Sequence, residues 1–167
     1  FRSKKIFDIS YQKIKILIHP SSYIHALVKF KNGITKILLH EPDMKIPIHN
    51  TIHYLIKKPI KSKSIDFKIL NNLNFQKVDN KKFPLIKILD ILPKNNSLFE
   101  TALITINDYF VSMFIKKKIN YKKNINLINY NAHNKIFLKF LKKVPKNIRD
   151  IHKTRNYVYS KLHNSGI

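Results

Sequence analysis

The chain has 167 residues, of which 44% are hydrophobic, so it can form a folded core and is not a disordered tail. It contains no cysteine, which excludes disulfide bonds, thiolate metal sites and a cysteine nucleophile. Its two glycines, Gly33 and Gly166, are too few and too far apart for the glycine-rich turns of dinucleotide-binding and P-loop proteins.

The net charge of +24 raises nucleic acid as a partner, because basic side chains neutralise phosphates. Of the 33 basic residues, three are arginines (Arg2, Arg149 and Arg155) and the other 30 are lysines spread along the chain. Nucleic-acid readers favour the bidentate arginine fork. Lysine also shares AT-rich codons with the abundant Ile, Asn and Phe. We therefore expect the charge to reflect a biased genome, with nucleic-acid binding as the less favoured alternative.

The first part of the chain predicts a strand and a hairpin. Residues 1–7 alternate charged and apolar positions, as an amphipathic helix in mid-course does, so we expect the chain to begin inside a fold. Residues 13–18 predict a strand that becomes buried on both faces and ends before Pro20. The apolar runs 26–30 and 34–39 predict an antiparallel hairpin, because the Asn32-Gly33 pair between them accepts the positive φ of a tight turn.

The middle of the chain predicts irregular structure. Pro42 and Pro47 are expected to keep the residues between them in a loop, since two prolines five apart do not fit one regular element. Residues 57–82 are rich in Lys, Asn and Ser and predict an extended linker. We accordingly place the end of an α+β domain in residues 1–56, a linker in 57–82 and a helical domain in 83–167.

Residues 83–167 have a helical period. A helix is predicted from Pro84 to Leu92, and Ser97 with Glu100 forms a capping box before an apolar stripe that runs from Leu98 to Phe114. Weaker helical patterns cover 125–130, 135–143 and 148–162. The predicted fold class is α+β: a strand and a β-hairpin, an extended linker, and a small C-terminal helical bundle. No membrane span is expected, because the longest apolar stretch, 102–115, is shorter than the roughly 20 residues required.

Possible metal ligands gather between His40 and His53, and they also include Glu41, Asp43 and His49. His49 and His53 have the spacing that places two residues on one helix face. The pattern lacks the intervening glutamate of a zinc-protease motif, and such spacing is common by chance in a chain with eight histidines. Solvated loop groups are the favoured interpretation.

His19 and His25 flank a turn made of Pro20, Ser21 and Ser22. Proline fixes the exit of the strand, and hydroxyl and imidazole donors follow it. A histidine at a strand end is as often a packing residue, so the residues alone leave a binding role and a structural role equally open.

Residues 18–48 resemble a series of motifs in the 1-deoxy-D-xylulose 5-phosphate reductoisomerase family. The matching segments are 18–28 (family I-H-P-x-S-x-I-H-x-x-V), Asn32-Gly33 (D-G) and 41–48 (E-P-D-M-R-x-P-I). Fainter matches follow at 64–67 (L-D-F), Phe83-Pro84 (Y-P) and Ala102-Leu103 with Asn107-Asp108 (A-L-N-A-A-N-E). The chain departs from the family at Ile104, where the family has Asn, and at Asp108, where it has Glu.

The resemblance implies an enzyme that converts 1-deoxy-D-xylulose 5-phosphate into 2-C-methyl-D-erythritol 4-phosphate in non-mevalonate isoprenoid biosynthesis. Its cofactors are NADPH and Mg²⁺ or Mn²⁺. In that family the NADPH domain and the carboxylate metal ligands precede the part that matches Phe1. This chain is therefore expected to be a C-terminal portion that is inactive alone, with no catalytic, cofactor-binding or metal-binding residues of its own.

What the resemblance assigns to this chain is one wall of a phosphosugar pocket. His25, Pro42 and Met44 are expected to line the substrate site, and His19 and Ser22 match the motif with less defined roles. The resemblance also implies a homodimer without membrane contact, in the cytoplasm of a bacterium with an AT-rich genome or in a plastid-type organelle. The alternatives are a basic, non-enzymatic module that binds nucleic acid and a remnant that only dimerises through its hairpin.

Overall fold

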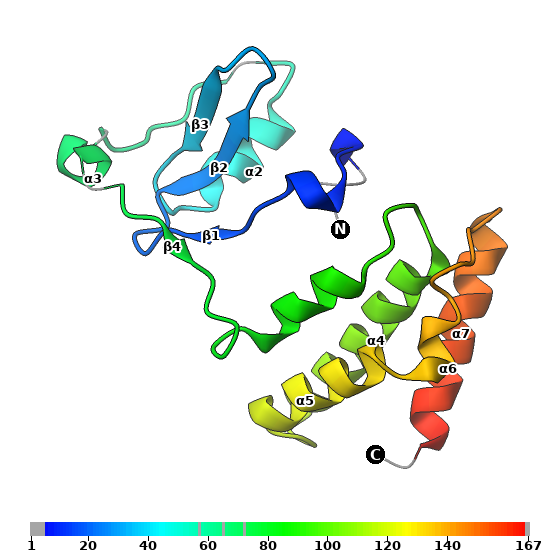
Figure 1. Cartoon of the computed structure of the whole chain (residues 1–167). Helices are drawn as coiled ribbons and strands as arrows, with labels where there is room; N and C mark the ends of the chain where they lie inside the picture. The colour runs from blue at the N-terminus through cyan, green and yellow to red at the C-terminus, as the bar shows by residue number, and fades with distance from the viewer. Residues whose placement is uncertain (1–5, 57, 65, 72, 166–167) are drawn as a thin grey trace. The chain divides into compact units, whose positions relative to one another are not determined.

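The computed structural model describes residues 6–56, 58–64, 66–71 and 73–165. They form two compact units: unit 1 contains the described residues up to Lys15 and from Asp79 onward, and unit 2 contains those from Ile16 to Val78. Figure 1 shows short strands in unit 2 and a group of helices in unit 1. The structure therefore mixes helices with small sheets, as the α+β class requires. The start of the helix expected over 1–7, Ile65 of the 64–67 motif, and Gly166 lie outside the described residues.

Unit 2 contains two separate two-stranded antiparallel sheets. Strand β1 (Leu17–Ile18) pairs with β4 (Gln76–Lys77), and β2 (Ile24–Lys29) pairs with β3 (Thr35–Leu39). The strand predicted over 13–18 is much shorter, because η1 (Tyr11–Lys13) precedes it and β4 offers only two residues for pairing. Ile16 and Leu17 are nearly half exposed, so the expectation of burial on both faces was wrong for the described residues.

The predicted hairpin is present, but its turn differs from the expected one. The Phe30 amide donates to the Ile34 carbonyl at 2.8 Å, and the Gly33 amide donates to the Phe30 carbonyl at 3.1 Å. Gly33 has φ +88°, whereas Asn32 is not among the described residues with positive φ. The connection is therefore a three-residue loop that ends in a left-handed glycine, and Asn32 instead accepts a hydrogen bond from the Ile34 amide.

Two expectations about the middle of the chain require correction. Helix α2 (Lys45–Ile52) begins directly after Met44 and includes Pro47, which had been expected to help hold a loop. A proline is tolerated there because the first amides of a helix have no intrahelical carbonyl partner. The segment 57–82, expected to be extended, contains the short helix α3 (Phe67–Asn71) and strand β4.

From residue 83 onward, unit 1 has a helix at each place where the sequence predicted one. These are η2 (Pro84–Ile91), α4 (Leu98–Ile115), α5 (Tyr121–Ala132), α6 (Lys135–Leu138) and α7 (Ile148–Asn164). The first is a 3-10 helix, and α6 ends well before the predicted boundary at residue 143. The Ser97 hydroxyl caps α4 by accepting from the Phe99 amide at 3.2 Å. Glu100, which is buried, accepts a 2.7 Å hydrogen bond from the Tyr11 hydroxyl.

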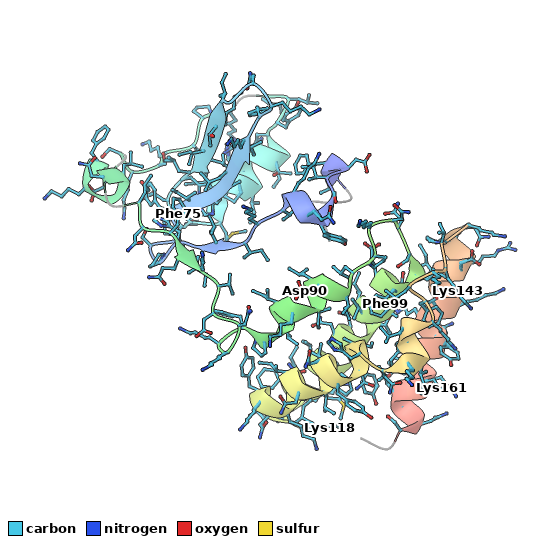
Figure 2. All side chains as sticks on the ribbon, viewed as in Figure 1. Phe75, Asp90, Phe99, Lys118, Lys143 and Lys161 are labelled. Atoms are coloured by element: carbon cyan, nitrogen blue, oxygen red, sulfur yellow. The ribbon has the colours of Figure 1, made fainter. Side chains whose placement is uncertain are left out.

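The hydrophobic core of unit 1 forms around α4. Its buried members are spaced three and four residues apart, as one face of a helix requires. Residues from α4, α5, α6 and α7 meet in this core: Leu98, Phe99, Ala102, Leu103, Ile106, Phe110, Ile128, Ala132, Phe137, Val158 and Leu162. Phe99, labelled in Figure 2, is fully buried. Helix α4 is long and apolar enough to cross a membrane, with a mean hydropathy of 1.3, but its apolar face is already used by this core.

Candidate functional site

The turn after β1 holds the imidazole of His19 from two sides. The Nε2 atom lies 2.7 Å from the Ser21 hydroxyl, and Nδ1 lies 3.3 Å from the Asn74 carbonyl oxygen. A carbonyl can only accept, so the neutral ring that satisfies both contacts carries its proton on Nδ1 and accepts from Ser21. Ser22 has φ 53° and donates its amide to the His19 carbonyl at 2.9 Å. Ser21, not Ser22, is thus the hydroxyl paired with His19.

His25 lies on β2, where its ring stacks on that of His40. The ring centroids are 3.7 Å apart and the planes differ by 16°. The Nε2 atom of His25 lies 3.3 Å from the carbonyl oxygen of His40, so it is the nitrogen that donates. His40 in turn donates from Nδ1 to the carbonyl of Glu41. The stacked pair fixes the orientation of the exposed His25 ring at this end of the hairpin.

The segment from Glu41 to Met44 leads from β3 into α2. The Asp43 amide donates to the Glu41 carbonyl at 2.7 Å, and the Asp43 carboxylate accepts from the Lys45 amide at 2.9 Å. The Glu41 carboxylate accepts from the Lys63 amide at 3.2 Å. Both acidic side chains therefore accept hydrogen bonds from backbone amides. Pro42 and Met44 remain exposed, Met44 by 69%.

The structure links some of the predicted pocket residues and separates others. His25, His40 and the loop that carries Pro42 and Met44 are connected by the ring stack and by consecutive hydrogen bonds. His19 and Ser22 belong to the connection between β1 and β2. The roles of all five predicted residues stay predictions. His40 had been considered only as a metal ligand, although the hairpin register, with Ala26 opposite Leu38, already places position 25 beside the end of β3.

The possible metal ligands of the chain do not gather in a metal-binding cluster within the described residues. His49 and His53 do share one face of α2, with ring centroids 4.5 Å apart. Within the described ranges, however, no group of three or more His, Cys, Asp or Glu residues could hold an ion, and two imidazoles are fewer than the three or four protein ligands of a zinc site. Gly33 serves a hairpin turn, not a phosphate-binding loop.

Comparison with known proteins identifies relatives along almost the whole chain. Residues 39–158 match the family model of the DXP reductoisomerase C-terminal domain. The 1-deoxy-D-xylulose 5-phosphate reductoisomerase of Pelagibacter ubique (strain HTCC1062) is 45% identical over 160 residues, which are 96% of this chain and 41% of that protein. The one of Sulfurihydrogenibium sp. (strain YO3AOP1) is 35% identical over 116 residues, which are 70% of this chain and 31% of that protein.

Solved structures show the same fold. A DOX-P reductoisomerase with fosmidomycin and magnesium superposes with a TM-score of 0.77 at 24% identity, over 98% of this chain and 42% of that one. The Zymomonas mobilis reductoisomerase in complex with NADPH gives a TM-score of 0.70 at 22% identity, over 93% and 40%. The chain thus spans about two fifths of the length of these proteins. It belongs to the DXP reductoisomerase family and corresponds to the C-terminal portion of its members.

Proposed function

We propose that this chain acts as the C-terminal portion of an enzyme that converts 1-deoxy-D-xylulose 5-phosphate into 2-C-methyl-D-erythritol 4-phosphate, and that it forms one wall of the phosphosugar pocket. The family of its relatives supports this activity. NADPH supplies the hydride and Mg²⁺ or Mn²⁺ polarises the hydroxyketone, both from the part of the enzyme that this chain does not span.

The stacked His25–His40 pair is the observation that carries the proposal. It holds the His25 imidazole beside the loop that presents Pro42 and Met44. Phosphosugar pockets combine a few placed polar donors with apolar contacts for the carbon skeleton. With Nε2 engaged by the His40 carbonyl, Nδ1 is the ring nitrogen of His25 that is left to form a hydrogen bond with the substrate.

His19 and Ser22 have a different role in this proposal. Both ring nitrogens of His19 already have partners, Ser21 and Asn74. The left-handed backbone of Ser22 completes the same turn. We assign these two residues to positioning the strand exit, and we assign substrate contact to His25, Pro42 and Met44.

The first test is an NADPH-oxidation assay on the isolated chain, with the phosphosugar and Mg²⁺. No turnover is expected, because we assign the NADPH and metal sites to the part of the enzyme that this chain does not span, and the described residues contain no group of three or more metal-ligating side chains. Turnover by the pure chain would overturn the view that the chemistry lies outside it.

The second test restores the rest of the enzyme. This chain replaces the matching C-terminal part of the Pelagibacter ubique reductoisomerase, which is 45% identical to it. The chimera is expected to oxidise NADPH with the substrate. His25→Ala should lower kcat/KM by about threefold to tenfold, as expected for a lost hydrogen bond to the substrate.

The matched control is His152→Ala, which removes an exposed imidazole from α7. It should leave kcat/KM unchanged. Equal losses in the two variants would contradict the proposed role of His25, and a folded chimera without activity would contradict the proposed function.

A further inference from the structure

A cavity of about 470 Å³ lies between α4 and α7, within unit 1. Its volume is within the range of small-molecule sites, which is roughly 300 to 1,000 Å³. The polar side chains that converge on it come from both helices and from the residues that follow α4: Asp108, Ser112, Lys116, Lys118, Arg155 and Tyr159. Asp108 belongs to the Asn107-Asp108 motif, and the proposed enzymatic function assigns no role to this motif.

The charges in this cavity do not cancel one another. Lys116, Lys118 and Arg155 supply three positive charges and Asp108 supplies one negative charge, a balance of +2. In the part of the chain that the structure describes, the side chains of Asp108 and Arg155 have neither an ion pair nor a hydrogen bond, although both line the same cavity. Because the two charged side chains share a cavity but do not pair with each other, each can bind a different group of the same ligand.

We propose that this cavity binds a small phosphomonoester that also carries hydroxyl groups. A phosphomonoester has a charge of about −1.5 to −2 at pH 7, which matches the balance of the cavity. The guanidinium of Arg155 has the planar fork that binds phosphate oxygens in pairs. The carboxylate of Asp108 can only accept hydrogen bonds, so it binds hydroxyl groups and repels a second anion.

Arg155 is exposed and, unlike the two lysines of this cavity, does not lie at a helix end. Lys116 and Lys118 lie at the end of α4, where their amides donate to the carbonyls of Ser112 and Met113 and their charges offset the negative end of the helix. Lys118 is labelled in Figure 2. Arg155 lies in the middle of α7, away from either helix end. It is the cation that best distinguishes a phosphate site from ordinary helix capping.

A second basic cavity, between α6 and α7, shows what a less specific arrangement looks like. Lys139, Lys143, Lys146 and Lys153 line it, and it has no arginine. The ammonium of Lys139 lies 3.8 Å from the ring centroid of Tyr157, so that ring face is already covered and cannot stack on a nucleobase. These lysines are exposed, as are the cations of the first cavity, but no arginine lies among them, so they provide a reference for non-specific anion binding.

The binding test uses the intact chain and titration calorimetry at about 0.15 M salt, where the Debye length is about 8 Å and generic attraction is screened. The probes are D-ribose 5-phosphate, D-ribose and inorganic phosphate. Ribose 5-phosphate should bind more tightly than inorganic phosphate, and ribose should not bind. This measurement needs no turnover, so its outcome is independent of the proposed enzymatic role.

Arg155→Gln should weaken the binding of ribose 5-phosphate by about tenfold or more. Arg149→Gln is the matched control, because Arg149 lies on the same helix, is exposed, does not line the cavity and carries the same charge. It should change Kd by less than about twofold, as expected for a distant, screened charge. Arg155→Lys keeps the charge without the fork and should give an intermediate Kd, which preserves the test if Arg155→Gln does not fold.

Asp108→Asn tests the hydroxyl-binding part of the site. It should reduce the preference for ribose 5-phosphate over inorganic phosphate, because the amide no longer repels a bare anion. The proposal is overturned if the Arg149 and Arg155 variants lose affinity equally, if the wild-type chain binds the two phosphates equally, or if it binds neither.

Discussion

The two units use their apolar residues in opposite ways. In unit 1, Phe99, Ile106 and Phe110 are fully buried in one core. In the described part of unit 2, Tyr23 is the one hydrophobic residue that is buried, whereas Leu38 and Leu55 are exposed by 59% and 88%. A set of helices can close around its own apolar stripes. A two-stranded hairpin has two faces, and in the described part of unit 2 many of its apolar side chains, such as Leu27, Val28 and Leu38, stay exposed.

The largest expected effect tests this contrast directly. Phe99→Ala should lower the free energy of unfolding of unit 1 by about 3 to 5 kcal/mol, because it leaves a cavity in a closed core. Leu38→Ala, on the exposed hairpin, should change stability by less than about 0.5 kcal/mol. Urea unfolding of the intact chain, followed by circular dichroism, measures both. Similar losses would show that unit 2 has a core of its own.

A cap provides the next comparison between the units. Ser97→Ala removes the hydroxyl that accepts from the Phe99 amide and should cost about 1 kcal/mol of stability. Met44, at the corresponding position before α2, makes no capping hydrogen bond through its side chain. Met44→Ala should therefore be close to neutral in the same unfolding experiment. No loss in Ser97→Ala would mean that the Ser97 hydroxyl does not stabilise α4.

Features that depend on neighbouring residues were predictable from the sequence. Ser97 and the apolar stripe after it predicted α4, and Asn32-Gly33 predicted the hairpin. The helical position of Pro47 was missed, because a proline only breaks a helix beyond its first turn.

Features that depend on distant residues were not predictable. Pairing of β1 with β4 joins segments almost sixty residues apart in sequence, and no local pattern specifies it. The same holds for the site. The motifs pointed to His25, but the stacked partner His40 follows from strand register, and the presence of Asp108 and Arg155 in one cavity follows from helix packing.

The hairpin turn allows a smaller change to be measured within unit 2. Gly33 has φ +88°, and a Cβ atom there would meet no other atom within 4 Å, so Gly33→Ala has only a backbone cost. That cost is about 1 kcal/mol. Amide hydrogen exchange at Phe30 and Ile34 should accelerate in Gly33→Ala and not in Lys31→Ala. Unchanged exchange in both variants would show that the turn does not need a left-handed residue.

The smallest expected effect concerns the pH at which two tyrosines of unit 1 ionise. Burial raises the pKa of Tyr11, and its hydrogen bond to Glu100 acts in the same direction. The ammonium of Lys139, which lies over the ring, lowers the pKa of Tyr157, and the charges of Lys161 and Lys143 add to this effect. In an ultraviolet titration, Tyr157→Phe should therefore remove an early-ionising phenol and Tyr11→Phe a late one.

The contributions of the two tyrosines to stability should also change with pH in opposite directions. An unfolded tyrosine ionises near pH 10, so the contribution of Tyr11 is complete below that pH and is lost as pH rises through the higher folded pKa. The contribution of Tyr157 appears as pH rises through its lowered folded pKa toward 10. Thermal unfolding at alkaline pH of the two Phe variants should show these opposite trends. Parallel pH profiles would contradict the environments described for both phenols.

The last helix of the chain completes the core that α4 begins. Val158 and Leu162 of α7 are buried with Phe99 and Phe110, yet the ribosome makes them only after α4, α5 and α6. During synthesis, the part of the α4 apolar face that α7 covers stays exposed until α7 has emerged. Chaperones and proteases recognise such exposed surfaces. A premature stop before Val158 would therefore do more than remove one helix. It would leave the apolar surface that Val158 and Leu162 cover exposed in the truncated chain, so unit 1 needs α7 to complete its core.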